Sequence, residues 1–139
     1  MNLRTQQFAV DVVLFAQSIE KIPVVRWLAK QFVDAATSVA ANQRAARRSR
    51  STKELAAKLS IVVEEADEAA FWCELLRSLP LPTPLMPELN RLTDEAQQLL
   101  AIFAKGRSTV RSRLAGALGL LLPVTILFLF GFALLVLVS

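Results

Sequence analysis

Apolar residues recur through the first part of the chain with the alternating three- and four-residue spacing of a heptad repeat. The pattern occurs four times, over residues 8–22, 25–42, 55–76 and 85–103. A spacing that averages about 3.5 residues keeps one stripe of each helix facing a common axis. The sequence therefore predicts four helices packed as a bundle, and no segment shows the alternation typical of a strand.

The predicted helices are separated by residues that end helices. Pro23 interrupts the first two, residues 49–52 read SRST, and residues 80–87 contain four prolines. Ser51 and Glu54 have the spacing of a capping box, which predicts that the third helix starts just after Ser51. Connections this short favour an all-α, antiparallel, up-down-up-down four-helix bundle.

The composition changes at Arg113, the last charged residue. Residues 114–138 read LAGALGLLLPVTILFLFGFALLVLV, and as a helix they would span about 37 Å, against about 30 Å of membrane hydrocarbon. We predict two parts, a bundle domain at 1–113 and a C-terminal transmembrane helix at 114–138. Because Arg107 and Arg111 also precede the apolar segment, the positive-inside rule predicts a cytoplasmic N-terminal domain in a tail-anchored arrangement. A late frameshift would also produce such an abrupt change, and this alternative stays open.

Residue types exclude most chemistry. A chain of 139 residues is long enough for about one domain. It contains no histidine, which excludes Ser/His and Cys/His catalytic pairs and metal sites that use histidine. The four glycines match no phosphate-binding loop. Cys73 is the single cysteine, and its apolar neighbours predict a core residue. We expect a protein that is not an enzyme and that uses no cofactor and no metal.

The charge is net positive, formally +4, and it is concentrated in two places. In an up-down-up-down bundle the turn after the second helix lies at the same end as the start of the apolar segment. Both groups of cations would therefore meet there, as a surface for anionic lipid or nucleic acid. The predicted binding residues are Arg44, Arg47, Arg48, Arg50, Lys53, Arg107, Arg111 and Arg113. A solvated turn without a ligand is the remaining alternative.

Other residues are expected to order the bundle and its assembly. Asn42 occupies a seam position, which predicts a role in fixing register. Acidic residues at 64–68, including Glu65 and Glu68, are expected to pair with Arg44 across the bundle rather than to bind a metal. Apolar residues off the main seams would form a second stripe that self-association buries. The predicted oligomer interface contains Val10, Leu14, Val63, Phe71 and Trp72, with Ala70 beside them and Trp27 as a core or interface anchor.

The segment from residue 38 to residue 76 carries a resemblance to a known family. Its features are an S-x-x-A-N ending of the second helix, a basic turn with an Arg-Ser pair, and an E-A-x-E-x-x-x-W run. The first and last are formed by Ser38, Ala41, Asn42, Glu65, Ala66, Glu68 and Trp72. The segment resembles the bacterial four-helix bundle protein family, which includes proteins encoded in intervening sequences of large-subunit ribosomal RNA genes and the accessory variability protein of diversity-generating retroelements.

The resemblance implies a four-helix protomer that assembles into a homopentamer without known enzymatic activity. In the retroelement members a basic surface binds nucleic acid and the partner is a reverse transcriptase. This chain departs from the family after Arg113, where the apolar segment replaces a short polar end. We therefore expect a homo-oligomeric helical scaffold anchored in the bacterial inner membrane, with the basic turn on anionic headgroups. The alternative is a nucleic-acid-binding accessory protein, and the sequence names no protein partner.

Overall fold

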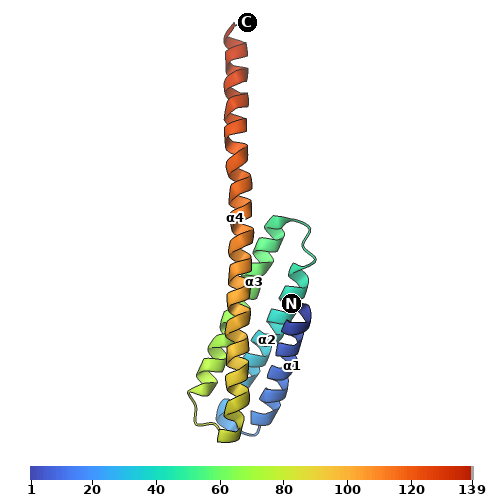
Figure 1. Cartoon of the computed structure of the whole chain (residues 1–139), viewed down its shortest axis with the longest axis vertical. Coiled ribbons are helices and arrows are strands. Elements are labelled where there is room, and N and C mark those ends of the chain that lie inside the picture. The colour runs from blue at the N-terminus through green and yellow to red at the C-terminus, as the bar shows by residue number, and fades with distance from the viewer. Residues whose placement is uncertain (139) are drawn as a thin grey trace.

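The computed structural model describes the backbone of residues 1–138 and the side chains of residues 1–116. Within residues 1–138 the chain is all-α, with four α-helices, two short 3-10 helices and no strand (Figure 1). This confirms the predicted fold class at the level of four helices. The elements are α1 (Asn2–Ile19), η1 (Pro23–Val25), α2 (Arg26–Ala46), α3 (Thr52–Arg77), η2 (Thr83–Leu85) and α4 (Met86–Val138).

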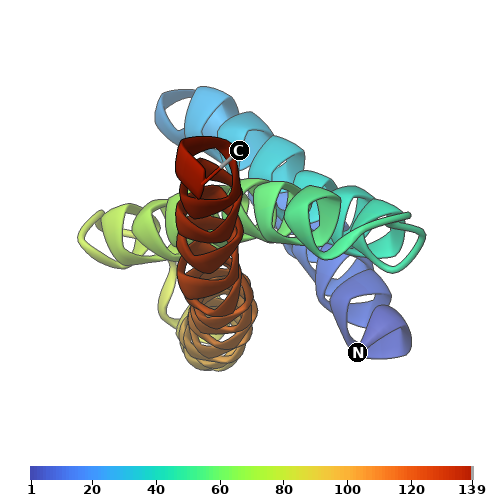
Figure 2. The same ribbon diagram turned by 90° about the horizontal axis from the view of Figure 1, so that it is seen from above.

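Consecutive helices run in opposite directions, as the short connections require. The turn between α2 and α3 lies at one end of the bundle, and the proline-rich connection to α4 lies at the other (Figure 1). Seen from above, the helices are inclined to one another rather than strictly parallel (Figure 2). α4 passes the α2–α3 turn and continues beyond the bundle (Figure 1). The helix is continuous across Arg113, so the change of composition there is not marked by a backbone break.

The core is built from the predicted stripes. Phe8 and Phe32 are fully buried and meet edge-to-face, with ring centroids 6.3 Å apart, and this contact joins α1 to α2. Leu76 and Leu92 are buried between α3 and α4, which joins the second pair of helices. Cys73 is fully buried in the same cluster, and burial raises the pKa of its thiol to about 12. The prediction of a core cysteine is confirmed.

The stripe of α2 departs from the predicted heptad. It follows Val39 with the buried Gln43 and Ala46, whereas Asn42 is half-buried and donates a hydrogen bond to the Ser38 carbonyl of its own helix at 3.0 Å. The prediction that Asn42 occupies the seam and fixes register is wrong. A straight α-helix drifts by about 20° per heptad relative to a 3.5-residue repeat, so over three heptads the buried stripe moves from one residue to the next.

The contact between α1 and α4 is closed by two arginines that bridge the helices. The Arg4 guanidinium donates to both carboxylate oxygens of Glu95, at 2.6 and 2.8 Å. Arg91 on α4 donates to Asp11 on α1 at 2.6 Å and also binds Glu88 on its own helix. Charge-assisted pairs of this kind add directional contacts where α1 and α4 meet.

No helix in the described part of the structure is both long enough and apolar enough to span a membrane. The predicted transmembrane segment comprises residues 114–138. From residue 117 onward its side chains are outside the part of the chain that the structure describes.

Candidate functional site: the basic end of the bundle

The last turn of α2 is closed by hydrogen bonds to its free carbonyl groups. The Ala45 carbonyl accepts from the Arg48 backbone N–H at 3.0 Å and from the Lys58 ammonium of α3 at 3.3 Å. The Ala46 carbonyl accepts from the Ser49 hydroxyl at 2.7 Å. Helix ends carry such unpaired carbonyls, so these contacts fix the path of the chain into the turn.

The predicted capping box at the start of α3 is confirmed. The Ser51 hydroxyl accepts a hydrogen bond from the Glu54 backbone N–H at 3.1 Å. The Glu54 carboxylate accepts from the Arg50 backbone N–H at 2.8 Å and pairs with Lys58 at 2.8 Å. The contact with Lys58, followed by that with the Arg50 N–H, lowers the pKa of Glu54. The Glu54 carboxylate thus contacts the Arg50 backbone and the Lys58 ammonium rather than an arginine side chain.

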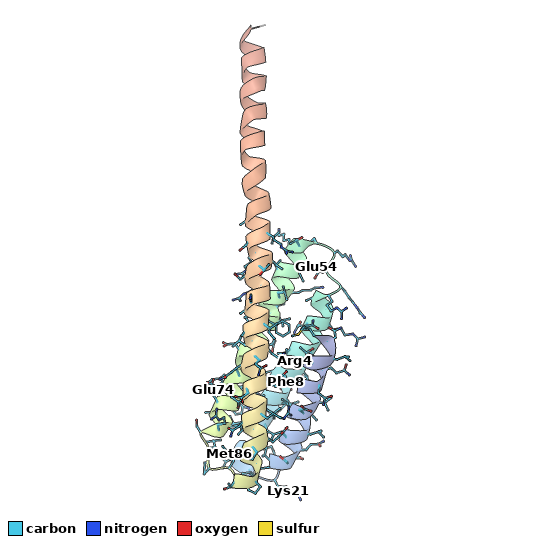
Figure 3. All side chains as sticks on the ribbon, in the orientation of Figure 1. Arg4, Phe8, Lys21, Glu54, Glu74 and Met86 are labelled. Atoms are coloured by element: carbon cyan, nitrogen blue, oxygen red, sulfur yellow. The ribbon has the colours of Figure 1, made fainter. Side chains whose placement is uncertain are left out.

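The predicted basic cluster lies on this turn with its side chains free in solvent. All five members are exposed, and none has an ion-pair partner among the described side chains. Figure 3 places Glu54 at this end of the bundle and Lys21 at the opposite end. The turn is therefore a concentrated patch of positive charge, formed by Arg44, Arg47, Arg48, Arg50 and Lys53.

The second basic group lies on α4. Arg107 is half-buried, while Arg111 and Arg113 are exposed. The Arg111 guanidinium donates a hydrogen bond to the Ser60 hydroxyl of α3 at 3.1 Å, which ties this part of α4 to the first half of α3. α4 leaves the bundle at the end that carries the α2–α3 turn (Figure 1), and the view from above shows the turn set apart from α4 (Figure 2). The two basic groups therefore belong to the same end of the bundle.

The antiparallel packing also brings in residues that the sequence analysis did not single out. Asn2 and Gln6, from the first turns of α1, line a cavity of about 720 Å³ together with Arg44 of α2. Their role depends on which turn of α1 lies opposite the end of α2, and sequence spacing does not give this register. One signal was available, since the chain has no acidic residue before Asp11.

The predicted pairing of Arg44 with the acidic run is wrong. Lys58 contacts the Ala45 carbonyl, so Glu65, two turns further along α3, is remote from the end of α2. Burial raises the pKa of Glu65, repulsion from Glu68 and Glu64 adds to the rise, and a hydrogen bond with Ser38 opposes it.

The Glu68 carboxylate accepts a hydrogen bond from the Trp72 indole N–H at 3.0 Å, one turn along its own helix. Among the described residues this is a local contact and not a contact across the bundle.

The predicted oligomer interface divides into exposed and buried members. Val10 and Leu14 are 45 and 59% exposed on α1 and line a groove that includes Thr37 of α2. Val63 and Ala70 are buried in the core of their own protomer, so their assignment to an interface is wrong. Inclined helices bury a wider stripe than one heptad seam, and this stripe takes in both residues.

The aromatic members form a separate patch across α2 and α3. Trp72 is half-buried and meets Trp27 edge-on, with ring centroids 5.6 Å apart. Phe71 is 53% exposed and meets Trp72 at 4.9 Å. Large aromatic surface left in solvent is typical of a contact site.

Comparison with known proteins gives a similar fold. The chain is similar to a crystal structure of a protein of unknown function from the S23 ribosomal protein family of Bacteroides thetaiotaomicron, with a TM-score of 0.65 and 23% identity. The similarity covers 75% of this chain and 94% of that one. No protein-family model and no curated protein matches the sequence. The similarity supports the helical bundle fold, while membership of the four-helix bundle family stays a prediction.

Proposed function

We propose that this chain is a non-enzymatic, homo-oligomeric scaffold anchored in the bacterial inner membrane by residues 114–138. Its bundle domain lies in the cytoplasm, and its basic end contacts the anionic headgroups of the inner leaflet. The observation that carries the proposal is the continuity of α4, which runs as one helix from the core, past the basic turn, to Val138. An apolar helix long enough to cross the hydrocarbon would leave the membrane at the end of the bundle that carries the arginines.

Electrostatics support this orientation. Each Lys or Arg near an anionic leaflet contributes about 1 kcal/mol, within a screening length of about 8–10 Å. The exposed Arg44, Arg47, Arg48, Arg50 and Lys53 have no competing carboxylate partner among the described residues. An oligomer repeats the cluster, and the attraction of the assembly rises with the number of copies.

The exposed apolar residues support self-association around a ring. Leu14 shares a cavity with Leu85, near the end of the bundle remote from the basic turn. Phe71 contacts Trp72, which meets Trp27 at the start of α2, so this patch lies toward the same end. Copies anchored in one membrane share one orientation, so the two patches of neighbouring copies lie at equal height and can contact each other. Such a heterologous contact forms a ring when the rotation between neighbouring copies closes, and the family resemblance implies five copies.

Nucleic-acid binding is the second candidate. The same free arginines favour it, because guanidinium groups bind phosphates in pairs of hydrogen bonds. The residues of the turn include no aromatic side chain on which a base could stack. We therefore rank a phosphate-backbone contact with steep salt dependence second to the headgroup contact.

The test distinguishes membrane insertion of residues 114–138 from electrostatic binding by the basic end. Membranes from cells that express the full chain, or a chain that ends at Arg113, are washed with high salt and then with alkaline carbonate. We expect the full chain to remain in the membrane through both washes and the shortened chain to be released by salt. Release of the full chain by carbonate contradicts the anchor and directs the next test to nucleic acid.

A charge variant tests the headgroup contact. We expect R50Q/K53Q to weaken binding of the shortened chain to vesicles that contain phosphatidylglycerol. The control K21Q/R26Q removes two exposed charges at the opposite end and should bind as the unaltered protein does. Equal weakening by both variants would contradict a contact made by the basic end.

A further inference from the structure

The cavity at the basic end is a defined concave site between two helices. It lies between the first turns of α1 and the last turns of α2, and its volume of about 720 Å³ falls within the range of small-molecule sites, about 300–1,000 Å³. It is lined by Asn2, Leu3, Gln6, Ala40, Ala41, Arg44, Arg47 and Arg48. No carboxylate is among these residues.

The charged wall of the cavity suits a phosphate group. Arg44, Arg47 and Arg48 follow one another along the end of α2 and are free of ion pairs among the described side chains. Planar guanidinium groups bind phosphate oxygens through paired, charge-assisted hydrogen bonds. Glu54, which could compete, is held by Lys58 and by the Arg50 N–H.

The opposite wall suits hydroxyl groups. Asn2 and Gln6 line this wall, and side-chain amides can both donate and accept hydrogen bonds. The Asn2 amide oxygen is buried without a hydrogen-bond partner in the described structure. Leu3, Ala40 and Ala41 supply the apolar part of the lining.

We propose that this cavity binds the phosphate of a phosphorylated polyol, with the arginines on the phosphate and the amides of Asn2 and Gln6 on the polyol hydroxyls. The ligand is either the headgroup of a membrane lipid or a soluble phosphate ester of the same chemistry. The inference rests on the proposed function in that it uses the basic end, but it adds a discrete site to a diffuse charged surface.

The experiment uses the full chain in nonionic detergent at 150 mM salt. Glycerol 1-phosphate and inositol 1-phosphate are titrated calorimetrically as soluble probes. Native mass spectrometry counts the phosphatidylglycerol molecules that stay bound after extraction from nanodiscs of phosphatidylcholine with and without phosphatidylglycerol. Binding of a soluble probe shows that a soluble phosphate ester can be the ligand. A phosphatidylglycerol adduct without soluble binding identifies the lipid, and both results support the site.

Matched variants test the position of the site. R47Q/R48Q removes two charges from the cavity wall, and R50Q/K53Q removes two from the same turn outside the lining. We expect the first to weaken binding about tenfold or more and the second less than about threefold. Q6L changes no charge and should weaken binding as well, because it removes the amide partner of a hydroxyl.

Two results overturn the proposal. If the two double variants lose binding affinity equally, the cavity is not a discrete site but part of a diffuse charged surface. The headgroup contact of the proposed function is then unaffected. Absence of binding by both the soluble esters and the lipid rejects the site outright. Failure of the anchor is read separately, from the carbonate wash.

Discussion

Gln43 is buried near the end of α2, and its side-chain oxygen has no hydrogen-bond partner among the described residues. A buried amide without a partner costs about 1–3 kcal/mol. We expect Gln43→Leu, which has a similar volume, to raise the free energy of unfolding by about 1 kcal/mol in urea denaturation. Gln17→Leu, at an exposed position of α1, is the control and should give no gain. Destabilisation by Gln43→Leu would mean that the amide is satisfied in solution.

Glu65 supplies a pH-dependent test. Burial and the charges of Glu68 and Glu64 raise its folded-state pKa above the unfolded value. Its charged form therefore weakens the fold above the folded pKa, and this penalty disappears as the pH falls below the unfolded value. We expect Glu65→Gln to add a few tenths of a kcal/mol at pH 7 and nothing at pH 3. A gain that is equal at both pH values would contradict this origin, and urea unfolding at each pH measures it.

At the residue scale, the sequence predicted contacts between residues close in the chain better than it predicted contacts between helices. The Ser51 and Glu54 capping box depends on residues three apart, and spacing alone predicted it. The heptad template placed Asn42 in the seam, but Gln43 is the buried residue. The template assumes a repeat of 3.5 residues, and the buried stripe of a straight helix drifts away from that repeat. The pairing of Arg44 with Glu65 failed because it depends on how far one helix slides along another.

The start of α3 is the element most directly determined by sequence. Its Ser51 hydroxyl satisfies one of the free N–H groups of the first turn. We expect Ser51→Ala to lower the free energy of unfolding by about 1 kcal/mol, the usual cost of an N-cap. Thr52→Ala, one residue later, is the matched control, and a similar loss there would contradict a capping role. Urea denaturation followed by circular dichroism measures both.

Gly106 lies inside α4, where glycine weakens a helix. A Cβ atom built at this position meets no atom within 4 Å, so alanine can be accommodated without a clash. We expect Gly106→Ala to raise the free energy of unfolding by about 0.5–1 kcal/mol. Loss of stability in thermal unfolding would indicate that the position is crowded, for example by a neighbouring copy.

At the element scale, apolar periodicity predicted the four helices because each must bury one face in a common core. The continuity of α4 was not predicted, since its stripe ends at Phe103 and the residues up to Arg113 are largely polar. Nothing in that stretch stops a helix, and Arg111 holds it to Ser60. An apolar stripe indicates which residues of a helix are buried. The length of the helix also depends on where the next residue that ends a helix occurs.

At the scale of the whole molecule, the two exposed patches distinguish between kinds of assembly. In a ring, the Leu14 patch of one copy meets the Phe71 patch of the next. Leu14→Glu and Phe71→Glu should each give monomers, yet an equal mixture should give dimers, because one intact patch of each kind remains. Native mass spectrometry in detergent measures the species. Ile102→Glu, on α4, is the control and should leave the assembly intact.

If either patch paired with itself, the variant altered in the other patch would remain a dimer alone, and mixing would add nothing. That result would replace the ring by a two-fold contact. Sequence reasoning found the exposed members of both patches but also included Val63, because distance from a heptad seam does not establish exposure.

The continuity of α4 also has a mechanical consequence. A single helix that belongs to the bundle at one end and to the apolar segment at the other joins the two without a loop between them, although Pro123 lies inside it at a position where helices commonly kink. If the proposed anchor holds, a tilt of the apolar segment in the membrane would change the orientation of the bundle as well. Bilayer thickness would then be one of the factors that influence the angle at which the bundle is held.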